Sequence, residues 1–228
     1  MSEQKRILLV DDEKDILELL MYNLQNEGYK VKTASNGKDA VSLAGEYRPD
    51  MILLDIMMPD QDGVETCRQL RAIPELSGTH IIFLTARSEE YSEVAGFDAG
   101  ADDYIIKPIK PRALLSRIQA SFRRQKILNQ SDDVIKIMNL EIDKTSYTIK
   151  IDDQQISLPK KEFELLYFLA QHPNRVFSRD ELLRSIWGAD IYVLARTVDV
   201  HIRKVREKIG NDYITTVKGV GYKFIDKG

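Results

Sequence analysis

The chain has 228 residues, with 33 Lys or Arg against 36 Asp or Glu, which gives a formal net charge of −3 at pH 7. This length allows two ordinary domains. The sequence has no apolar run near the ~20 residues of a membrane helix and no secretory signal, so we predict a cytoplasmic protein without a membrane partner. The single cysteine, Cys67, excludes an intramolecular disulfide. Residues 1–124 carry a net charge of −5 and residues 125–228 one of +2, which predicts different partners for the two halves.

Five short apolar segments alternate with segments of helical period in the first half. They lie at residues 7–10, 30–34, 51–55, 81–86 and 103–107. Strands that alternate with helices in this way predict an α/β domain with a doubly wound, five-stranded parallel sheet covered on both faces.

The pattern changes after a polar stretch, so we place the domains at 1–124 and 134–228, with a linker at 125–133. The next residues, to Leu158, predict an antiparallel meander of short strands. Three helical segments and a two-stranded hairpin follow, and Ser178 three residues before Glu181 predicts a capping box at the second helix. The second domain is therefore predicted to be α+β.

Acidic and basic side chains fall at the carboxyl ends of the predicted parallel strands. Asp11 and Asp12 end the first strand, Asp55 the third, Thr85 the fourth and Lys107 the fifth. The carboxyl ends of such strands meet at one edge of the sheet. Clustered carboxylates repel one another unless a cation lies among them, and oxygen ligands without His or Cys favour Mg²⁺. Any one of these carboxylates, taken alone, is better explained as a strand-end cap.

Four segments resemble the receiver domain of bacterial two-component response regulators: LLVDDEKDI (8–16), LLDIMMPDQDG (53–63), LTA (84–86) and GADDYIIKP (100–108). The resemblance implies a flavodoxin-like fold and phosphorylation of Asp55 by a partner sensor histidine kinase with Mg²⁺ as cofactor. A carboxylate nucleophile that forms an aspartyl-phosphate suits this residue type.

The resemblance also assigns roles to single residues. It implies that Asp12 and Asp55 bind Mg²⁺ by their carboxylates, Asp11 chiefly through water, and Met57 by its backbone carbonyl. Thr85 and Lys107 are expected to contact the phosphoryl group, with Tyr104 as a switch residue. Pro108 is expected to follow a cis peptide bond.

Phosphorylated receivers of this family form homodimers through charged residues on one face. The residues that could supply such pairs here are Asp98, Asp102, Asp103, Arg112, Arg117 and Arg123. Two positions depart from the family pattern: Glu93 stands where a basic residue is usual, and Ala113 where a Glu is usual. Surface charges taken alone would be an ordinary solvated face.

Residues 196–208 carry five basic side chains against two acidic ones. As a helix this segment places Val198, Ile202, Val205 and Ile209 on an inward apolar stripe. A basic outer face fits the major groove of DNA, although an ordinary amphipathic surface helix explains the helix alone equally well. The glycine-containing hairpin that follows favours the DNA-binding interpretation.

The second half resembles the winged helix-turn-helix domain of the OmpR/PhoB subfamily, through the segments at 158–188, 196–209 and 216–224. The predicted DNA-contacting residues are Arg196, Thr197, Val200, His201, Arg203, Lys204, Arg206, Thr216, Lys218, Gly219 and Tyr222. The resemblance implies double-stranded DNA with tandem half-sites as the partner. The loop 189–195 contacts RNA polymerase in some members, and that contact is left open here.

These features predict a transcriptional regulator and not an enzyme. Phosphorylation at Asp55 would favour a receiver homodimer and DNA binding. Two alternatives remain. A Mg²⁺-dependent phosphatase also uses a strand-end aspartate, though usually at the first strand. A DNA-binding protein that has lost phosphorylation control would bind DNA regardless of Asp55.

Overall fold

The computed structural model describes residues 4–86, 99–127, 134–188 and 195–226. The chain divides into two compact units, Met1–Arg124 and Gln125–Gly228, which are described separately here. Among the described residues, no helix combines the length and apolar character needed to cross a bilayer.

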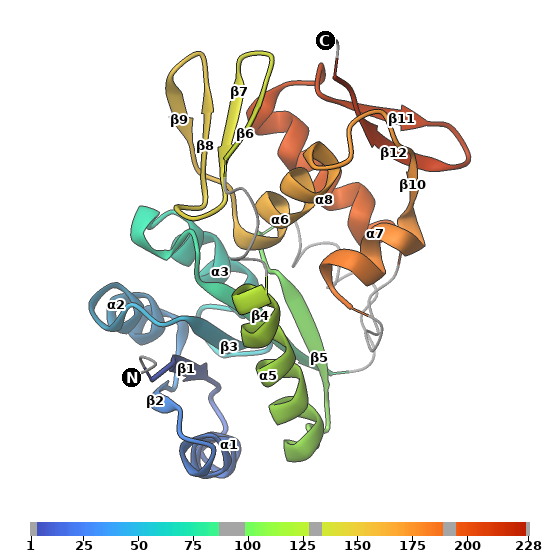
Figure 1. The fold of residues 1–228 in the computed structure, drawn as a ribbon. Helices are drawn as coiled ribbons and strands as arrows, with labels where there is room; N and C mark the ends of the chain where they lie inside the picture. The colour runs from blue at the N-terminus through green and yellow to red at the C-terminus, as the bar shows by residue number, and fades with distance from the viewer. Residues whose placement is uncertain (1–3, 87–98, 128–133, 189–194, 227–228) are drawn as a thin grey trace. The chain divides into compact units, whose positions relative to one another are not determined.

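The first unit contains the predicted five-stranded parallel sheet, and its strand order is β2-β1-β3-β4-β5. The strands are β1 (Arg6–Val10), β2 (Lys30–Ala34), β3 (Met51–Asp55), β4 (His80–Ala86) and β5 (Asp103–Lys107). The described helices are α1 (Lys14–Asn26), α2 (Gly37–Tyr47), α3 (Gly63–Arg71), α5 (Pro111–Ile127) and a short 3₁₀ turn at Pro74–Leu76. The sequence prediction of these strands is confirmed (Figure 1).

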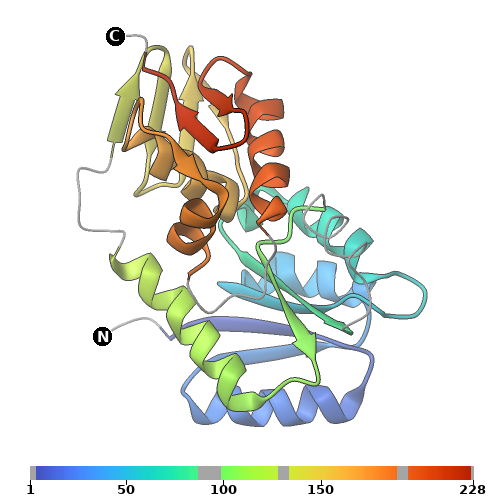
Figure 2. The same ribbon diagram turned by 90° about the vertical axis from the view of Figure 1, so that its right-hand side faces the viewer.

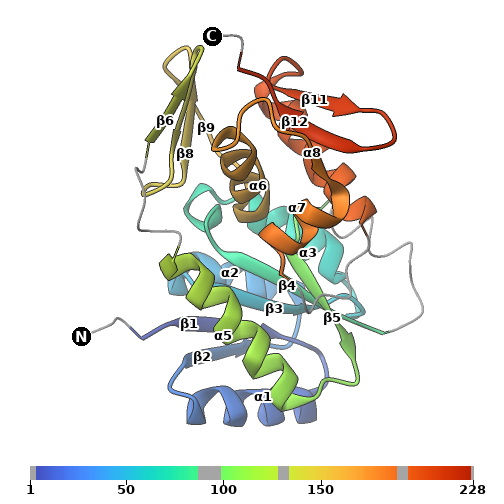
Figure 3. The same ribbon diagram turned by 45° about the vertical axis from the view of Figure 1, so that its right-hand side comes forward.

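Helices cover both faces of this sheet. Leu20 and Leu24 of α1 and Ile118 of α5 pack with sheet residues such as Leu53 and Leu84 in one buried cluster. Helices α2 and α3 contact each other on the opposite face (Figures 2 and 3). A central strand covered on both faces needs apolar residues at every position, and β3 is buried along its whole length.

The predicted linker is too long at its start, because α5 continues as far as Ile127. The sequence after Gln125 is polar and shows no apolar period, so the last two residues of the helix were not predicted. The first strand of the second unit, β6, begins at Val134, where the second domain was predicted to start.

The second unit consists of a four-stranded antiparallel sheet, three helices and a three-stranded antiparallel sheet. The first sheet comprises β6 (Val134–Ile137), β7 (Leu140–Asp143), β8 (Thr148–Ile151) and β9 (Gln154–Ile156). The helices are α6 (Lys160–Ala170), α7 (Arg179–Ile186) and α8 (Arg196–Ile209). The second sheet comprises β10 (Phe177–Ser178), β11 (Ile214–Val217) and β12 (Gly221–Phe224).

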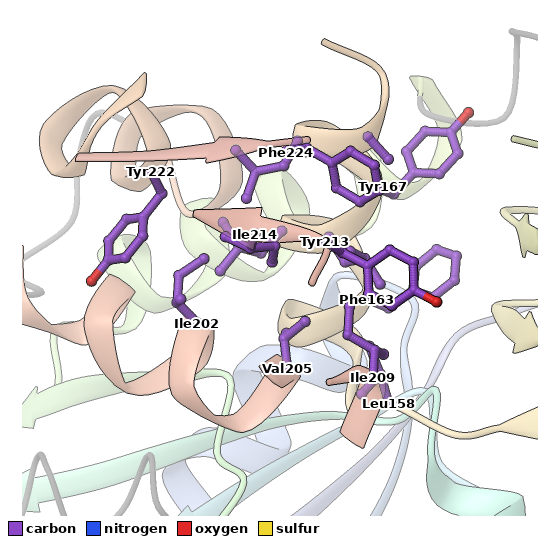
Figure 4. Close-up of a cluster of buried hydrophobic side chains, with 14 of the residues drawn as sticks. Leu158, Phe163, Tyr167, Ile202, Val205, Ile209, Tyr213, Ile214, Tyr222 and Phe224 are labelled. Carbon is purple, nitrogen blue, oxygen red and sulfur yellow. The ribbon is translucent and has the colours of Figure 1, made fainter. Parts of the chain in front are cut away.

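The capping box predicted at Ser178 is present: the Ser178 side chain accepts from the Glu181 amide, and the Glu181 carboxylate accepts from Ser178. Such a cap fixes where α7 begins and stabilises the unit by about 1 kcal/mol. Helices α6, α7 and α8 share one buried core with both sheets. Figure 4 shows the part of this core formed by α6, α8 and the β11–β12 hairpin. The hairpin of β11 and β12 projects from the unit, as Figure 1 shows in red. This is a winged-helix arrangement, as the sequence predicts.

Candidate functional site

Three carboxylates meet at the carboxyl ends of β1 and β3, which are neighbours in the sheet. Oxygen atoms of Asp11, Asp12 and Asp55 all lie within 4.8 Å of one another. Asp11 and Asp55 are buried, whereas Asp12 is exposed. The parallel register pairs Val10 with Leu54, so the residues that follow them lie side by side. The site is therefore open to solvent on the Asp12 side.

Lys107, at the end of β5, joins this cluster. Its ammonium group lies 2.9 Å from Asp11 Oδ2, 3.2 Å from Asp55 Oδ2 and 3.5 Å from Glu13 Oε1. Burial alone would lower the pKa of Lys107, but the hydrogen bond to Asp11 and the charges of Asp55 and Asp11 outweigh it and raise the pKa. The lysine is thus held as a cation against two carboxylates.

Asp55 has a pKa raised above its ordinary value. The main cause is desolvation by burial, and the nearby charge of Asp11 adds to it. The charge of Lys107 and the backbone N–H of Met57 act in the opposite direction. Because the ionised form is poorly solvated here, a further positive charge in the cluster would stabilise it.

The donor set fits a hard divalent cation. The three groups are carboxylates, which suit Mg²⁺, and one of them faces solvent, as a partly hydrated ion requires. Each carboxylate alone would be an unremarkable strand end. Their convergence from two strands, with Lys107 supplied by a third, makes a binding site the better explanation.

Gly63 is a site residue that sequence analysis missed. A Cβ atom at this position would lie 2.1 Å from the backbone oxygen of Asp55, so only glycine fits there. Its amide donates to the carbonyl of Ile56 at 2.9 Å, and Asp62 caps the helix that starts at Gly63. The loop between Asp55 and α3 is thereby held tightly against the site. The Asp-Gly pair directly before a helix was the available signal.

The remaining residues predicted for the phosphorylation site lie in β4, in β5 and in the segments that follow β3 and β5. Thr85 is buried near the end of β4, and Tyr104 is buried in β5. The side chain of Met57 is exposed in the loop after β3. The peptide bond between Lys107 and Pro108 is cis, as predicted.

Asp102 does not lie on a charged outer face, so the prediction that it serves a dimer face is wrong. It is fully buried, and its Oδ2 lies 2.6 Å from Arg71 Nη2 and accepts the amide of Ile81 at 2.8 Å. Arg71 also donates to the carbonyls of Gly100 and Thr79. A buried carboxylate needs such partners, and its charged partner, Arg71 of α3, lies 31 residues earlier in the sequence.

The other predicted dimer-face residues are placed as follows. Arg112 is exposed, Asp103 is half-buried, and Arg117 is half-buried with Nη1 donating to the carbonyl of Tyr104 at 3.2 Å. Asp98 and the Arg123 side chain, like Glu93, lie outside the described part of the chain. The loop considered for RNA polymerase contact lies outside it up to residue 194.

In the second unit, α8 buries the predicted stripe of Val198, Ile202, Val205 and Ile209. The exposed or half-exposed residues of the predicted DNA-contacting set are Arg196, Val200, Arg203, Lys204, Arg206, Thr216, Lys218 and Gly219. Gly219 has a φ of +77°, which a residue with a side chain would adopt only with strain, at the tip of the hairpin.

Three residues that were predicted to be exposed and to contact DNA are buried, so the prediction of their exposure is wrong. Thr197 and His201 are about as buried as the core, and the His201 ring packs on Trp187 with ring centroids 5.0 Å apart. Position 201 follows Val198 by three residues and precedes Val205 by four, which sets it beside the inward stripe. Tyr222 is also buried, and its hydroxyl donates to Asp199 at 2.6 Å.

Comparisons with known proteins find a matching family for each half of the chain. A family model of the response regulator receiver domain matches residues 7–119. A model of the C-terminal domain of transcriptional regulatory proteins matches residues 153–224. The transcriptional regulatory protein SrrA of Staphylococcus aureus is 44% identical over 230 residues, which cover 96% of this chain and 94% of SrrA.

Two solved structures are similar over nearly the whole chain. One is DrrB, described as an OmpR/PhoB homolog from Thermotoga maritima, with 37% identity and a TM-score of 0.51. The match covers 98% of this chain and 100% of DrrB. The other is a mutant of RitR, with 31% identity and a TM-score of 0.78, covering 97% of this chain and 99% of RitR.

Proposed function

Because this chain belongs to the response regulators of the OmpR/PhoB type, we propose that Asp55 accepts a phosphoryl group from a sensor histidine kinase and that this controls DNA binding by the second unit. The observation that carries the proposal is the convergence of Asp11, Asp12 and Asp55 within 4.8 Å, with Lys107 3.2 Å from Asp55.

Transfer would occur by attack of an Asp55 carboxylate oxygen on the phosphorus of the kinase's phosphohistidine. The new O–P bond forms as the P–N bond breaks, and the imidazole keeps the bonding electron pair and takes up a proton. Asp11, Asp12 and Asp55, with the backbone carbonyl of Met57, would hold Mg²⁺, which supplies neutralisation of the phosphoryl charge. Lys107 would supply a second positive charge, and Thr85 a hydroxyl donor.

The acyl phosphate carries about −1.5 to −2 units of charge where the Asp55 carboxylate carried −1, beside Asp11 and Lys107. Contacts among Lys107, Asp11 and Asp55 must rearrange to accommodate it. Thr85 lies on β4, which pairs with β3, and Tyr104 lies on β5, the strand that carries Lys107. This rearrangement is proposed to favour a homodimer of the first unit. Asp102 is excluded from its contacts by burial, which leaves Asp103, Arg112 and Arg117 as described candidates.

The second unit would place α8 in the major groove of DNA and the turn of the β11–β12 hairpin against the backbone or minor groove. A dimer would then bind two tandem half-sites. Arg196, Arg203 and Lys204 of α8, with Lys218 of the hairpin, supply positive charge for phosphate contacts.

The test compares DNA binding by the full chain with and without acetyl phosphate and Mg²⁺. The probe is a duplex recovered from a random-sequence pool by the phosphodonor-treated protein. We expect tighter binding and a dimer in sedimentation after treatment, and neither effect in Asp55→Asn. Equal binding in all four samples would instead favour the alternative of a regulator without phosphorylation control. Steady release of phosphate from p-nitrophenyl phosphate, lost in Asp55→Asn, would favour the phosphatase.

A further inference from the structure

Tyr222 and Arg206 are predicted from the sequence to contact DNA, but both side chains contact other residues of the second unit. The Tyr222 hydroxyl donates to Asp199 Oδ1 at 2.6 Å, which joins β12 to the first turn of α8. Arg179, the first residue of α7, donates from Nε to the same oxygen at 2.7 Å. The guanidinium carbon of Arg179 also lies 5.2 Å from the centre of the Tyr222 ring.

Arg206 makes a second connection between α8 and the hairpin, this time to β11. Its Nη2 donates to the carbonyl of Ile214 at 2.8 Å and to Thr216 Oγ1 at 3.0 Å. Its guanidinium carbon lies 5.7 Å from the centre of the Tyr222 ring. Both strands of the hairpin are therefore attached to α8 by charged side chains.

The end of the hairpin next to its turn has little freedom to adjust, because Gly221, the residue paired with Val217 there, packs against β10. A Cβ atom on Gly221 would lie 1.9 Å from the backbone oxygen of Phe177, because β10 pairs closely with β12 at this point. Figure 4 shows Tyr222 at one end of the buried cluster, above α8, with its hydroxyl directed toward that helix. The tip at Lys218–Val220 is exposed. Tyr222 follows Gly221 in β12 and pairs with Thr216, so a change at Tyr222 acts close to the exposed tip.

We infer that Tyr222, Asp199, Arg179 and Arg206 are positioning residues that fix the hairpin on α8, and so set where Lys218 meets DNA relative to the base-reading face of α8. The inference rests on the DNA-binding role proposed above. It assigns to Tyr222 and Arg206 an indirect part in DNA recognition.

The protonation state of Tyr222 is consistent with this role. Burial, followed by the hydrogen bond to Asp199 and its charge, raises the pKa of Tyr222 to about 12. The hydroxyl is therefore a permanent donor to Asp199 at neutral pH. A hydrogen bond to a charged acceptor is among the stronger ones in proteins.

The test uses Tyr222→Phe, which keeps the ring and removes only the hydroxyl, and Asp199→Ala, which removes the acceptor. Both should bind the selected duplex about tenfold more weakly, as loss of one charged hydrogen bond implies. Binding to a scrambled duplex should change far less. The double variant should be no weaker than the weaker single variant, because both remove the same contact.

The matched control is Glu207→Ala, which removes an exposed acidic side chain from the same helix. By charge alone, removal of Asp199 or Glu207 should strengthen binding to DNA. Weaker binding by Asp199→Ala and stronger or equal binding by Glu207→Ala would support the inference. Tighter binding by Asp199→Ala, or additive losses in the double variant, would overturn it.

A measurement without DNA separates this inference from the proposed function. Amide hydrogen exchange over residues 214–224 should be faster in Tyr222→Phe and Asp199→Ala than in the wild type, and unchanged in Glu207→Ala. If the wild type bound no duplex, the DNA-binding proposal would fail, while the exchange rates would still decide the positioning role. Unchanged exchange in Tyr222→Phe would refute that role.

Discussion

The ammonium group of Lys107 lies 3.2 Å from a carboxylate oxygen of Asp55, although their strands, β5 and β3, are separated in the sheet by β4. The long lysine side chain therefore reaches across the edge of the sheet. It brings its charge to the carboxylate that we propose as the phosphoryl acceptor, and it contacts Asp11 on the way.

Lys107→Met should sharply reduce phosphorylation of Asp55. The variant removes the charge that lowers the pKa of Asp55 and that would neutralise the incoming phosphoryl group. The measurement is the fraction of protein carrying one phosphoryl adduct after a fixed time with acetyl phosphate and Mg²⁺. Lys110→Met is the control, since Lys110 is exposed three residues away. Equal yields in the two variants would contradict a role for Lys107.

Asp55→Asn should stabilise the metal-free protein at pH 7. The pKa of Asp55 is raised in the folded state, so the folded state binds this proton more tightly than the unfolded state. The resulting penalty is absent below the ordinary pKa of 3.8 and complete above the folded-state value. The gain in the midpoint of thermal unfolding should therefore shrink as the pH falls toward 3.8.

The control for this experiment is Asp60→Asn, which replaces an exposed loop carboxylate. It should change the free energy of unfolding by about 0.5 kcal/mol or less. Both variants are measured in EDTA across the same pH series. An Asp55→Asn gain that does not depend on pH would contradict this account, because it could not arise from ionisation of Asp55.

Arg71→Met should cost about 3–5 kcal/mol of unfolding free energy, because it leaves the buried Asp102 carboxylate without its charged partner. Urea unfolding measures this loss. Arg68→Met, on the same helix, removes an exposed pair with Glu65 and should cost about 0.5 kcal/mol. Similar losses for the two variants would show that the buried pair is not a structural requirement.

Cys67 should be unreactive in the native protein. Burial raises the pKa of its thiol to about 12, so almost no thiolate is present near neutral pH. The rate of reaction with a disulfide reagent should rise by orders of magnitude in denaturant. A Lys38→Cys variant, with a thiol on the exposed surface of α2, supplies the rate for an accessible group. A native Cys67 that reacts at that rate would contradict its burial.

Sequence pattern alone predicts the strands of the first unit and the gathering of Asp11, Asp55 and Lys107. This succeeds because a parallel sheet places all strand ends at one edge, so side chains far apart in the sequence are brought together by topology. The buried stripe of α8 is predicted for a similar reason, since Val198, Ile202 and Val205 follow the helical period without interruption.

The incorrect predictions of side-chain exposure have a common physical cause. Asp102, His201 and Tyr222 are polar residues whose burial depends on a partner from another element. Those partners are Arg71, Trp187 and Asp199, and no local pattern identifies them. Gly63 was missed because the Asp-Gly pair in the sequence indicates only where a helix begins, and the close approach of the Asp55 carbonyl becomes visible only in three dimensions.

The central claim is that Asp55 is a phosphoryl acceptor, and intact mass tests it most directly. The full chain is incubated with acetyl phosphate and Mg²⁺, beside Asp55→Asn and a wild-type sample in EDTA. The proposal predicts one phosphoryl adduct on the wild type with Mg²⁺ and none in the other two samples. An unmodified wild type that is folded by circular dichroism, or an adduct retained in Asp55→Asn, would contradict it.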